Sequence, residues 1–203
     1  MIIHDPKIVF IHIPKTGGTT IEKLLTANSK VGPPARGLGA HHRMQQVYNK
    51  FASPEIDEEN RINLAEYYLF TVARNPWERY ASMYVHDFKA YEDQGSKQRP
   101  LPIEEYMQKS VEENFFKFIE VNGQIPDNLM IINFDDFKAE IERVFITMGL
   151  KAPKRLYHAN KKTKKYKAME LEIIANKAFQ EAVAAMCDKE IALFGYDIPL
   201  DIG

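Results

Sequence analysis

"FIHIPKTGGTTIEKLL", residues 10–25, is the segment from which the fold of this chain is best inferred. An apolar run enters a short turn that contains Gly17 and Gly18, and helix-forming sequence follows at once. A glycine-bearing turn that leads into a helix presents unpaired backbone N–H groups at the positive end of the helix dipole. Lys15 adds a full positive charge, and the threonines of the turn offer hydroxyl groups, namely Thr16, Thr19 and Thr20. The turn is therefore predicted to bind a phosphate-like group.

This turn differs from a Walker A loop. In the Walker pattern the lysine follows the glycines, whereas Lys15 precedes Gly17 and Gly18. The alternative interpretation is a tight strand-to-helix turn in which a threonine caps the helix and the lysine is solvated. Both interpretations place the turn between a strand and a helix.

Three apolar runs, each followed by helix-compatible sequence, predict the fold class. The runs are Ile8–Ile13, Tyr67–Ala73 and Leu129–Phe134, and the helical segments are Thr20–Ala27, Trp77–Phe88 and Phe137–Met148. Runs without strict alternation suit a parallel sheet that is covered on both faces. We therefore expect a single α/β domain with a central parallel sheet flanked by helices. A last helical pattern, Met169–Phe194, is expected to stop at Gly195.

A second strand-to-helix junction, "FTVARNPWERYASMY" at residues 70–84, carries another possible anion site. Arg74 stands where the strand is expected to end, and Ser82 follows about two helical turns into the helix. Ligands of open α/β sheets bind outside the carboxyl ends of the strands, so Arg74 and the first turn are expected to share an edge. An arginine fork with a nearby hydroxyl suits a second phosphate, although a surface salt bridge is the alternative role for Arg74. Arg79 is expected to be structural or solvated.

The overall composition excludes several classes of protein. The 203 residues carry a formal net charge of −1, so the chain has no global attraction for nucleic acid or anionic membranes. Cys187 is the single cysteine, which excludes an internal disulfide framework. No apolar run approaches the ~20 residues of a membrane span. The expectation is a cytoplasmic protein without nucleic-acid or membrane partners and of unknown oligomeric state.

Together, "HIPKTGGTT" and "RNPWERYASMY" resemble the two signatures of sulfotransferases that use 3′-phosphoadenosine 5′-phosphosulfate (PAPS), in particular the carbohydrate-sulfotransferase-like branch with bacterial members. The resemblance implies a P-loop-NTPase-like sulfotransferase fold in one domain over residues 1–203, and an acceptor hydroxyl on a saccharide or small metabolite. It implies that the first turn holds the 5′-phosphosulfate and that Arg74 and Ser82 hold the 3′-phosphate. The residues implied at the 5′ end are Lys15, Thr16, Gly17, Gly18, Thr19 and Thr20.

The family also closes its nucleotide site with a late loop, which here corresponds to "NKKTKKYK", residues 160–167. The resemblance implies nucleotide contacts by Asn160, Lys161 and Lys162. The alternative for this lysine-rich run is a solvated face. Tyr166 is expected to have a core role, with packing on adenine as the alternative.

Sulfuryl transfer needs positive charge on the leaving phosphate oxygen and a base for the acceptor hydroxyl. Lys15 meets the first need, and the resemblance points to a histidine after the first helix for the second. His41 and His42 both fit, with His41 preferred, and Asp135 and Asp136 are the reserve candidates. The scheme requires no metal. An ATP-dependent phosphoryl transferase of related fold and a non-catalytic nucleotide-binding protein are the alternative functions.

Overall fold

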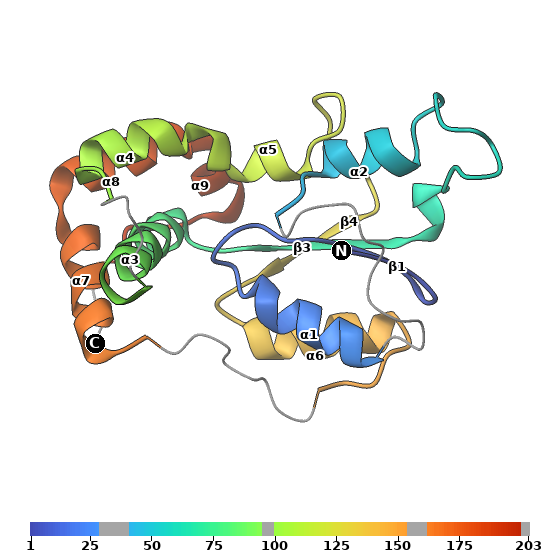
Figure 1. Cartoon of the computed structure of the whole chain (residues 1–203), viewed down its shortest axis with the longest axis horizontal. Coiled ribbons are helices and arrows are strands. Elements are labelled where there is room, and N and C mark those ends of the chain that lie inside the picture. The colour runs from blue at the N-terminus through green and yellow to red at the C-terminus, as the bar shows by residue number, and fades with distance from the viewer. Residues whose placement is uncertain (29–40, 95–99, 154–161, 200–203) are drawn as a thin grey trace. The chain divides into compact units, whose positions relative to one another are not determined.

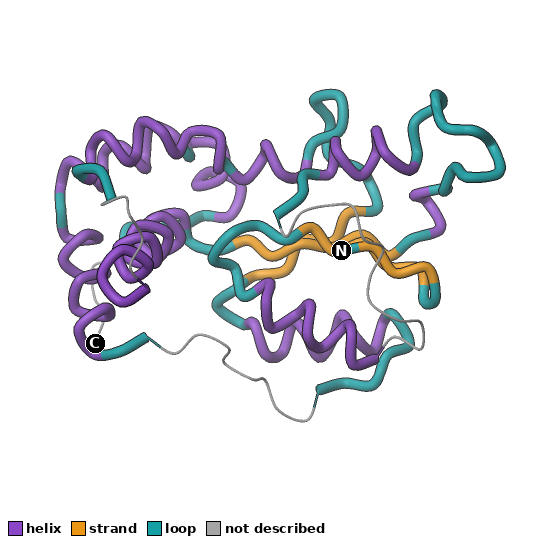
Figure 2. The backbone as a smooth tube through the Cα atoms, in the orientation of Figure 1, coloured by secondary structure: helices purple, strands orange, loops and turns teal. Residues whose placement is uncertain are grey.

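The computed structural model describes residues 1–28, 41–94, 100–153 and 162–199. The chain divides into two compact units, Met1–Ala73 with Phe116–Ala159 and Arg74–Phe115 with Asn160–Gly203. Within the described residues, the named strands belong to the first unit, and the second consists of helices and loops (Figure 2). The prediction of one domain over residues 1–203 stays a prediction. Each unit is described on its own below.

The first unit contains a four-stranded sheet in the order β1-β2-β3-β4. Its strands are β1 (Ile2–His4), β2 (Lys7–Ile11), β3 (Tyr68–Ala73) and β4 (Leu129–Asn133). β2, β3 and β4 are parallel, which confirms the three predicted runs, and β1 adds an antiparallel edge. The prediction missed β1 because a three-residue strand is too short to show a period.

The register brings the carboxyl ends of the parallel strands to one edge. Ile11 pairs with Thr71, and Ala73 pairs with Asn133. The amide of Phe134 continues this pairing by donating to the carbonyl of Ala73 at 2.9 Å. The segments that follow β2 and β4 therefore leave the sheet at the same edge.

Helices cover both faces of this sheet, which confirms the predicted α/β class. α1 (Gly18–Asn28) and α6 (Phe137–Thr147) lie on one face, and α2 (Met44–Phe51) lies on the other (Figure 1). The core on the first face joins alternate residues of the strands to apolar residues of α1 and α6, and its buried members include Ile8, Phe10, Phe70, Val72, Ile132, Ile21, Leu25, Ile141, Val144 and Phe145. Alternation along the strands turns Val9 and Ile11 to the opposite face. The remaining elements of this part of the chain are η1 (Leu64–Glu66) and α5 (Phe115–Ile119).

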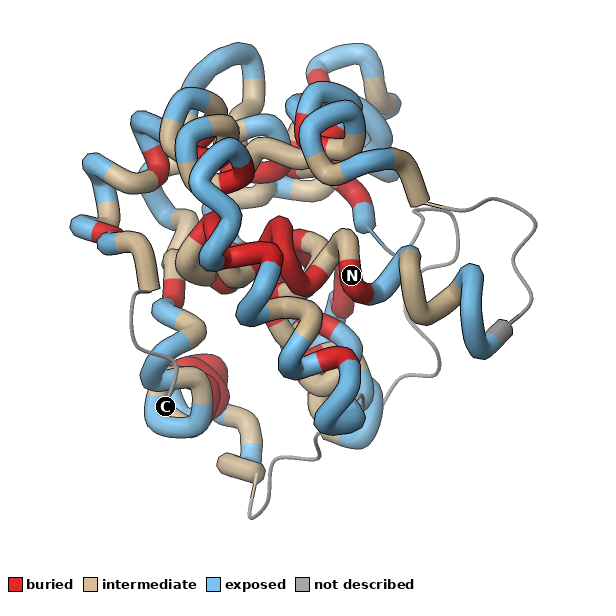
Figure 3. Tube along the Cα trace, turned by 90° about the vertical axis from the view of Figure 1, so that its left-hand side faces the viewer, coloured by how far each residue is buried: buried red, intermediate tan, exposed pale blue. Residues whose placement is uncertain are grey.

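The second unit is built on α3 (Pro76–Gln94). The other helices are α4 (Ile103–Lys109), η2 (Ser110–Glu113), α7 (Lys164–Ala175), α8 (Lys177–Met186) and α9 (Asp188–Phe194). α3 begins at a proline, whose fixed φ suits the first helical position, and it runs further than the predicted Trp77–Phe88. Along the helices in Figure 3, buried segments alternate with exposed ones, as expected for helices with one covered face.

The prediction of one continuous helix over Met169–Phe194 is wrong. The structure has α7, α8 and α9 in this region, separated at Asn176 and Cys187. The side chain of Asn176 accepts a hydrogen bond from the amide of Phe179, which caps a new helix. The apolar pattern continues through the breaks because all three helices contribute to the same core. Gly195 ends α9 with a φ of 65°, as predicted.

Arg79, Tyr166 and Cys187 are buried in this second unit. The Arg79 side chain is fully buried, donates to the carbonyl of Glu113 at 2.9 Å and lies 3.6 Å from the carboxylate of Glu190. Burial raises the pKa of the nearby Cys187 thiol to about 12, with the charge of Glu190 acting in the same direction. Tyr166 is buried as well, in agreement with its expected core role. These residues therefore have a structural role.

In the described residues, no helix is both long enough and apolar enough to cross a membrane.

Candidate active site

The turn after β2 has an unusual backbone. Lys15 has a φ of 66° and Gly17 a φ of 80°, both in the left-handed region. A lysine there costs roughly 1–2 kcal/mol, which the surrounding structure must offset, and such strain clusters at functional sites. The carbonyl of Gly17 accepts the amides of Thr20 and Ile21, so α1 starts here. The amides of Gly18 and Thr19 belong to the first turn, where a helix offers no internal acceptor.

Gly18 is required because the ring of His12 lies against it. A Cβ atom at Gly18 would lie 1.9 Å from Cδ2 of His12, and the ring itself is buried. Gly17 also has close neighbours, since its Cβ would lie 2.8 Å from the ring of Phe137 at the start of α6. The two glycines thus let the turn pack onto β2 and α6.

We expect Gly18→Ala to lower the free energy of unfolding by about 1–3 kcal/mol, because the new methyl group overlaps the His12 ring. Urea denaturation measures this cost. The control is a double-mutant cycle with His12→Ala. In the His12→Ala background, which lacks the ring, Gly18→Ala should lower the free energy of unfolding by less than it does in the wild type. An equal cost in both backgrounds would contradict the steric explanation.

The threonines of the turn are placed differently from one another. Thr16 is fully buried, and its hydroxyl donates to the carbonyl of Ile13 at 2.8 Å. Thr19 is exposed, and Thr20 is half-buried in the first turn of α1. Thr16 therefore stabilises the turn itself, and Thr19 is accessible to a ligand. Their predicted role in nucleotide binding stays a prediction.

The two candidate histidines lie in different environments. His42 is 3% exposed, and its Nε2 lies 2.6 Å from the α-amino nitrogen of Met1. His41 is exposed, and its Nδ1 lies 3.4 Å from the carbonyl oxygen of His12. With the proton on Nδ1 donated to that carbonyl, Nε2 of His41 is the unprotonated nitrogen. His41 is therefore an exposed residue with Nε2 as its basic atom, whereas His42 is buried against the α-amino group of Met1.

The ring of a second histidine, His12, contacts His41, and a carboxylate contacts His12 in turn. The His12 and His41 rings meet edge to face with centroids 4.4 Å apart, and His12 Nδ1 lies 3.0 Å from Oε1 of Glu22. Burial opposes ionisation of Glu22, but the hydrogen bond and charge of His12, together with the charges of the N-terminus and His41, lower the pKa of this carboxyl group. Partial burial lowers the pKa of His41, and the charges of His12 and Lys15 lower it further. The sequence analysis missed Glu22, which lies ten residues from His12 on α1.

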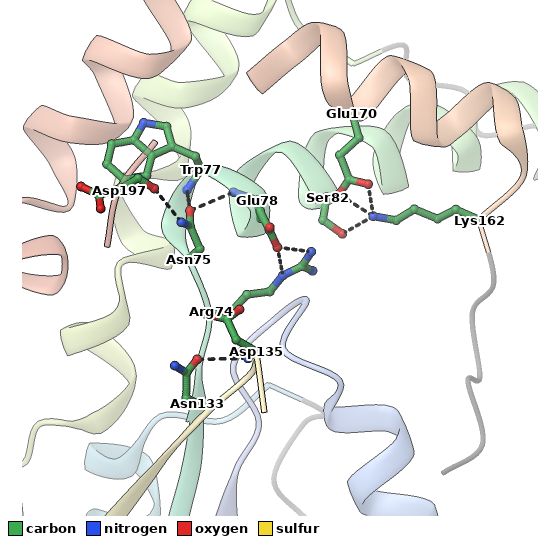
Figure 4. Close-up of polar contacts among 10 residues, drawn as sticks. All are labelled: Arg74, Asn75, Trp77, Glu78, Ser82, Asn133, Asp135, Lys162, Glu170 and Asp197. Atoms are coloured by element: carbon green, nitrogen blue, oxygen red, sulfur yellow. Dashed lines mark hydrogen bonds and ion pairs between the residues drawn. The ribbon is translucent and has the colours of Figure 1, made fainter. Parts of the chain in front are cut away.

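In the second unit, the structure brings Lys162, predicted to contact the nucleotide, to Arg74 and Ser82, which were predicted at the 3′-phosphate. Lys162 Nζ donates to Oγ of Ser82 at 3.0 Å, across 80 positions of sequence (Figure 4). The charge of Arg74 acts on Lys162 and lowers its pKa, after burial, which is the largest cause. Arg74 and Ser82 project from the junction and first turns of α3, and Lys162 comes from the segment before α7. Two cations and a hydroxyl suit a phosphate.

Carboxylates accompany both cations, and the sequence analysis named neither. Arg74 donates through Nε and Nη2 to Oε2 of Glu78 at 3.2 and 3.0 Å. Lys162 donates to both oxygens of Glu170 at 2.5 Å. Glu78 stands four residues after Arg74 on a predicted helix, so spacing alone was a usable signal. Glu170 had no such signal, because its contact depends on the path of the chain before α7.

Other predicted residues lie elsewhere. Asn160 and Lys161 fall outside the described residues. Asp135 and Asp136 are exposed, and the amide of Asp135 donates to Oδ1 of Asn133 at 3.1 Å. Asp136 occupies the N-cap position of α6 without a side-chain cap hydrogen bond. Among the residues that the structure describes, no group of three or more His, Cys, Asp or Glu side chains is arranged to hold a metal ion.

A sequence model of the sulfotransferase family matches residues 1–139. The chain belongs to this family. The match includes the Lys15 turn, His41 and the junction from Arg74 to Ser82, whereas Lys162 lies beyond it. No curated protein and no solved structure matches this sulfotransferase-family chain. Family membership supports sulfuryl transfer in general and a transferase activity, in agreement with the function predicted from the two signatures.

Proposed function

We propose that this chain transfers a sulfuryl group from PAPS to a hydroxyl on a saccharide or small metabolite, as a member of the carbohydrate-sulfotransferase-like branch. The observation that carries the proposal is the contact of Lys162 with Ser82 beside Arg74, because residues predicted separately from two distant motifs meet there. PAPS would supply the activated sulfuryl group. The 3′-phosphate would bind Arg74, Ser82 and Lys162. The predicted contacts of Asn160 and Lys161 are part of the same proposal.

The turn after β2 fits the 5′ end of such a nucleotide. Its left-handed backbone at Lys15 and Gly17 precedes the N-terminus of α1, where amide groups favour an anion. The charge of Lys15 would stabilise the negative charge that develops on the leaving phosphate oxygen. The site residues proposed here are Lys15, Thr16, Gly17, Gly18, Thr19 and Thr20.

His41 is the proposed general base. Its Nε2 would take the proton of the acceptor hydroxyl, while Nδ1 keeps its proton toward the carbonyl of His12. The lowered pKa keeps the ring neutral, and therefore basic, near neutral pH. His42 remains the alternative base, although its burial supports a structural role.

We expect the chain to bind 3′,5′-adenosine bisphosphate more tightly than AMP, and Arg74→Ala to weaken bisphosphate binding by about 10- to 30-fold. This range corresponds to about 1.4–2 kcal/mol, the lower end of what one hydrogen bond to a charged group contributes. Isothermal titration calorimetry without metal measures both affinities. AMP should bind wild type and variant alike, because it lacks the 3′-phosphate.

Arg143→Ala is the matched control, because Arg143 also pairs with a glutamate but lies on the exposed side of α6. It should leave bisphosphate binding unchanged. Equal affinity for bisphosphate and AMP would argue against the proposed 3′-phosphate site. Binding of ATP that requires Mg²⁺ would favour a phosphoryl transferase, and bisphosphate binding without transfer to any hydroxyl would favour a non-catalytic protein.

A further inference from the structure

Both cations of the proposed 3′-phosphate site already have carboxylate partners. Arg74 is bonded to Glu78, and Lys162 is bonded to Glu170 and to Ser82 (Figure 4). An ammonium group has three N–H donors. The two oxygens of Glu170 and the hydroxyl of Ser82 account for all three at Lys162. A phosphate would therefore gain a donor of Lys162 only by replacing an oxygen of Glu170 or the hydroxyl of Ser82.

The charges of the cluster also cancel. Arg74 and Lys162 contribute two positive charges, and Glu78 and Glu170 contribute two negative charges. A terminal phosphate carries about −1.5 to −2 charges at neutral pH. The neutral cluster offers little net attraction to such an anion. At Lys162, binding therefore requires that the phosphate compete with the carboxylate of Glu170.

The Lys162–Glu170 pair is more sheltered than the ordinary surface pairs of this chain. Its side chains are 27% and 13% exposed, whereas those of the Lys109–Glu105 pair are 67% and 52% exposed. Shelter from water strengthens the attraction between opposite charges. The pair also joins the segment before α7 to the helix itself, at a separation of eight residues. Glu170 is thus a stronger competitor for Lys162 than an exposed carboxylate would be.

We propose that Glu170 is an internal competitor for the 3′-phosphate, which weakens nucleotide binding and speeds release of the product nucleotide. This inference rests on the proposed function. PAPS and its product carry the same 3′-phosphate, so contacts to this group hold the product as firmly as the donor and do not favour the transition state. Release of product limits turnover in many enzymes. A carboxylate that recaptures Lys162 shortens the time that the product stays bound.

Glu170→Gln tests the inference. The amide keeps the size of the side chain and an oxygen acceptor for Lys162, but it removes the charge. We expect 3′,5′-adenosine bisphosphate to bind the variant roughly 2- to 5-fold more tightly, the range expected for loss of a partly exposed ion pair, and to dissociate more slowly. AMP should bind the variant and the wild type alike. Glu172→Gln is the matched control, because Glu172 is an exposed residue of the same helix.

Each outcome of the titration has a separate meaning. Tighter bisphosphate binding by the Glu170 variant alone supports the inference. If the wild type prefers bisphosphate to AMP but Glu170→Gln binds it equally or more weakly, the inference is overturned and the proposed function stands. Equal tightening by Glu172→Gln would show a general charge effect and would also overturn it. If none of the three proteins binds bisphosphate, both the inference and the proposed function fail.

Discussion

Replacing His41 with alanine is expected to lower the turnover of sulfuryl transfer by ~10²–10⁴-fold, because the acceptor hydroxyl loses its base. Affinity for 3′,5′-adenosine bisphosphate should change little, since the base acts on the acceptor and not on the nucleotide. The measurement is release of bisphosphate from PAPS with a hydroxyl acceptor found by screening, alongside calorimetry. His86→Ala is the control, because His86 is an exposed histidine of α3.

The pH profile gives an independent readout of the same residue. Partial desolvation of the ring and the charges of His12 and Lys15 lower the pKa of His41 below its ordinary value of 6.5. A base acts in its neutral form, so kcat/KM should rise with pH and reach its plateau below the pH at which an unperturbed histidine would. His41→Ala should remove this rise. Full activity of the variant would move the role of base to His42, Asp135 or Asp136.

Lys15→Ala is expected to lower turnover by ~10²–10³-fold, which corresponds to about 3–4 kcal/mol of transition-state stabilisation. Lys15 is the charged residue of the turn after β2. It has a left-handed φ of 66° and lies shortly before the N-terminus of α1. Its charge is needed most when the leaving phosphate oxygen gains negative charge. Product affinity should therefore fall less than the rate does.

Lys23→Ala is the control for this variant, since Lys23 is an exposed lysine on α1. A parallel loss of rate and product affinity would mean that Lys15 binds donor and transition state equally. If Lys15→Ala lowered the rate by less than tenfold, Lys15 would not be the residue that stabilises the leaving phosphate oxygen. Lys15→Arg keeps the positive charge but changes the geometry of the cationic group. We therefore expect its turnover to lie between those of Lys15→Ala and the wild type.

The sequence predicted the sheet and both junctions because their signals are local. Apolar runs of Ile, Val and Phe mark buried strands at any place in a chain. Gly17 and Gly18 mark a tight turn in which neither position accommodates a side chain. Gly17 has a left-handed φ, and the ring of His12 lies against Gly18. Pro76 marks a helix start in the same way.

The failures of prediction also have physical reasons. β1 is too short to show periodicity, and it is stabilised by pairing with β2 rather than by its own pattern. The breaks at Asn176 and Cys187 lie inside a continuous apolar pattern, because successive helices share one core. The carboxylate at position 170 was not recognised as part of the site, since its contact with Lys162 is a property of the fold.

By itself, the sequence determined the strand-to-helix order, the positions of the two strand-to-helix junctions and, through motifs within residues 1–139, the sulfotransferase family. Tertiary structure alone decided that His41 is exposed while His42 is buried, although the two are adjacent in the chain. It also brought Lys162 to Ser82 across 80 residues and gave the lysine a carboxylate partner in Glu170. The reason is that backbone preferences act over a few residues, whereas burial and charge pairing depend on which distant segments pack together.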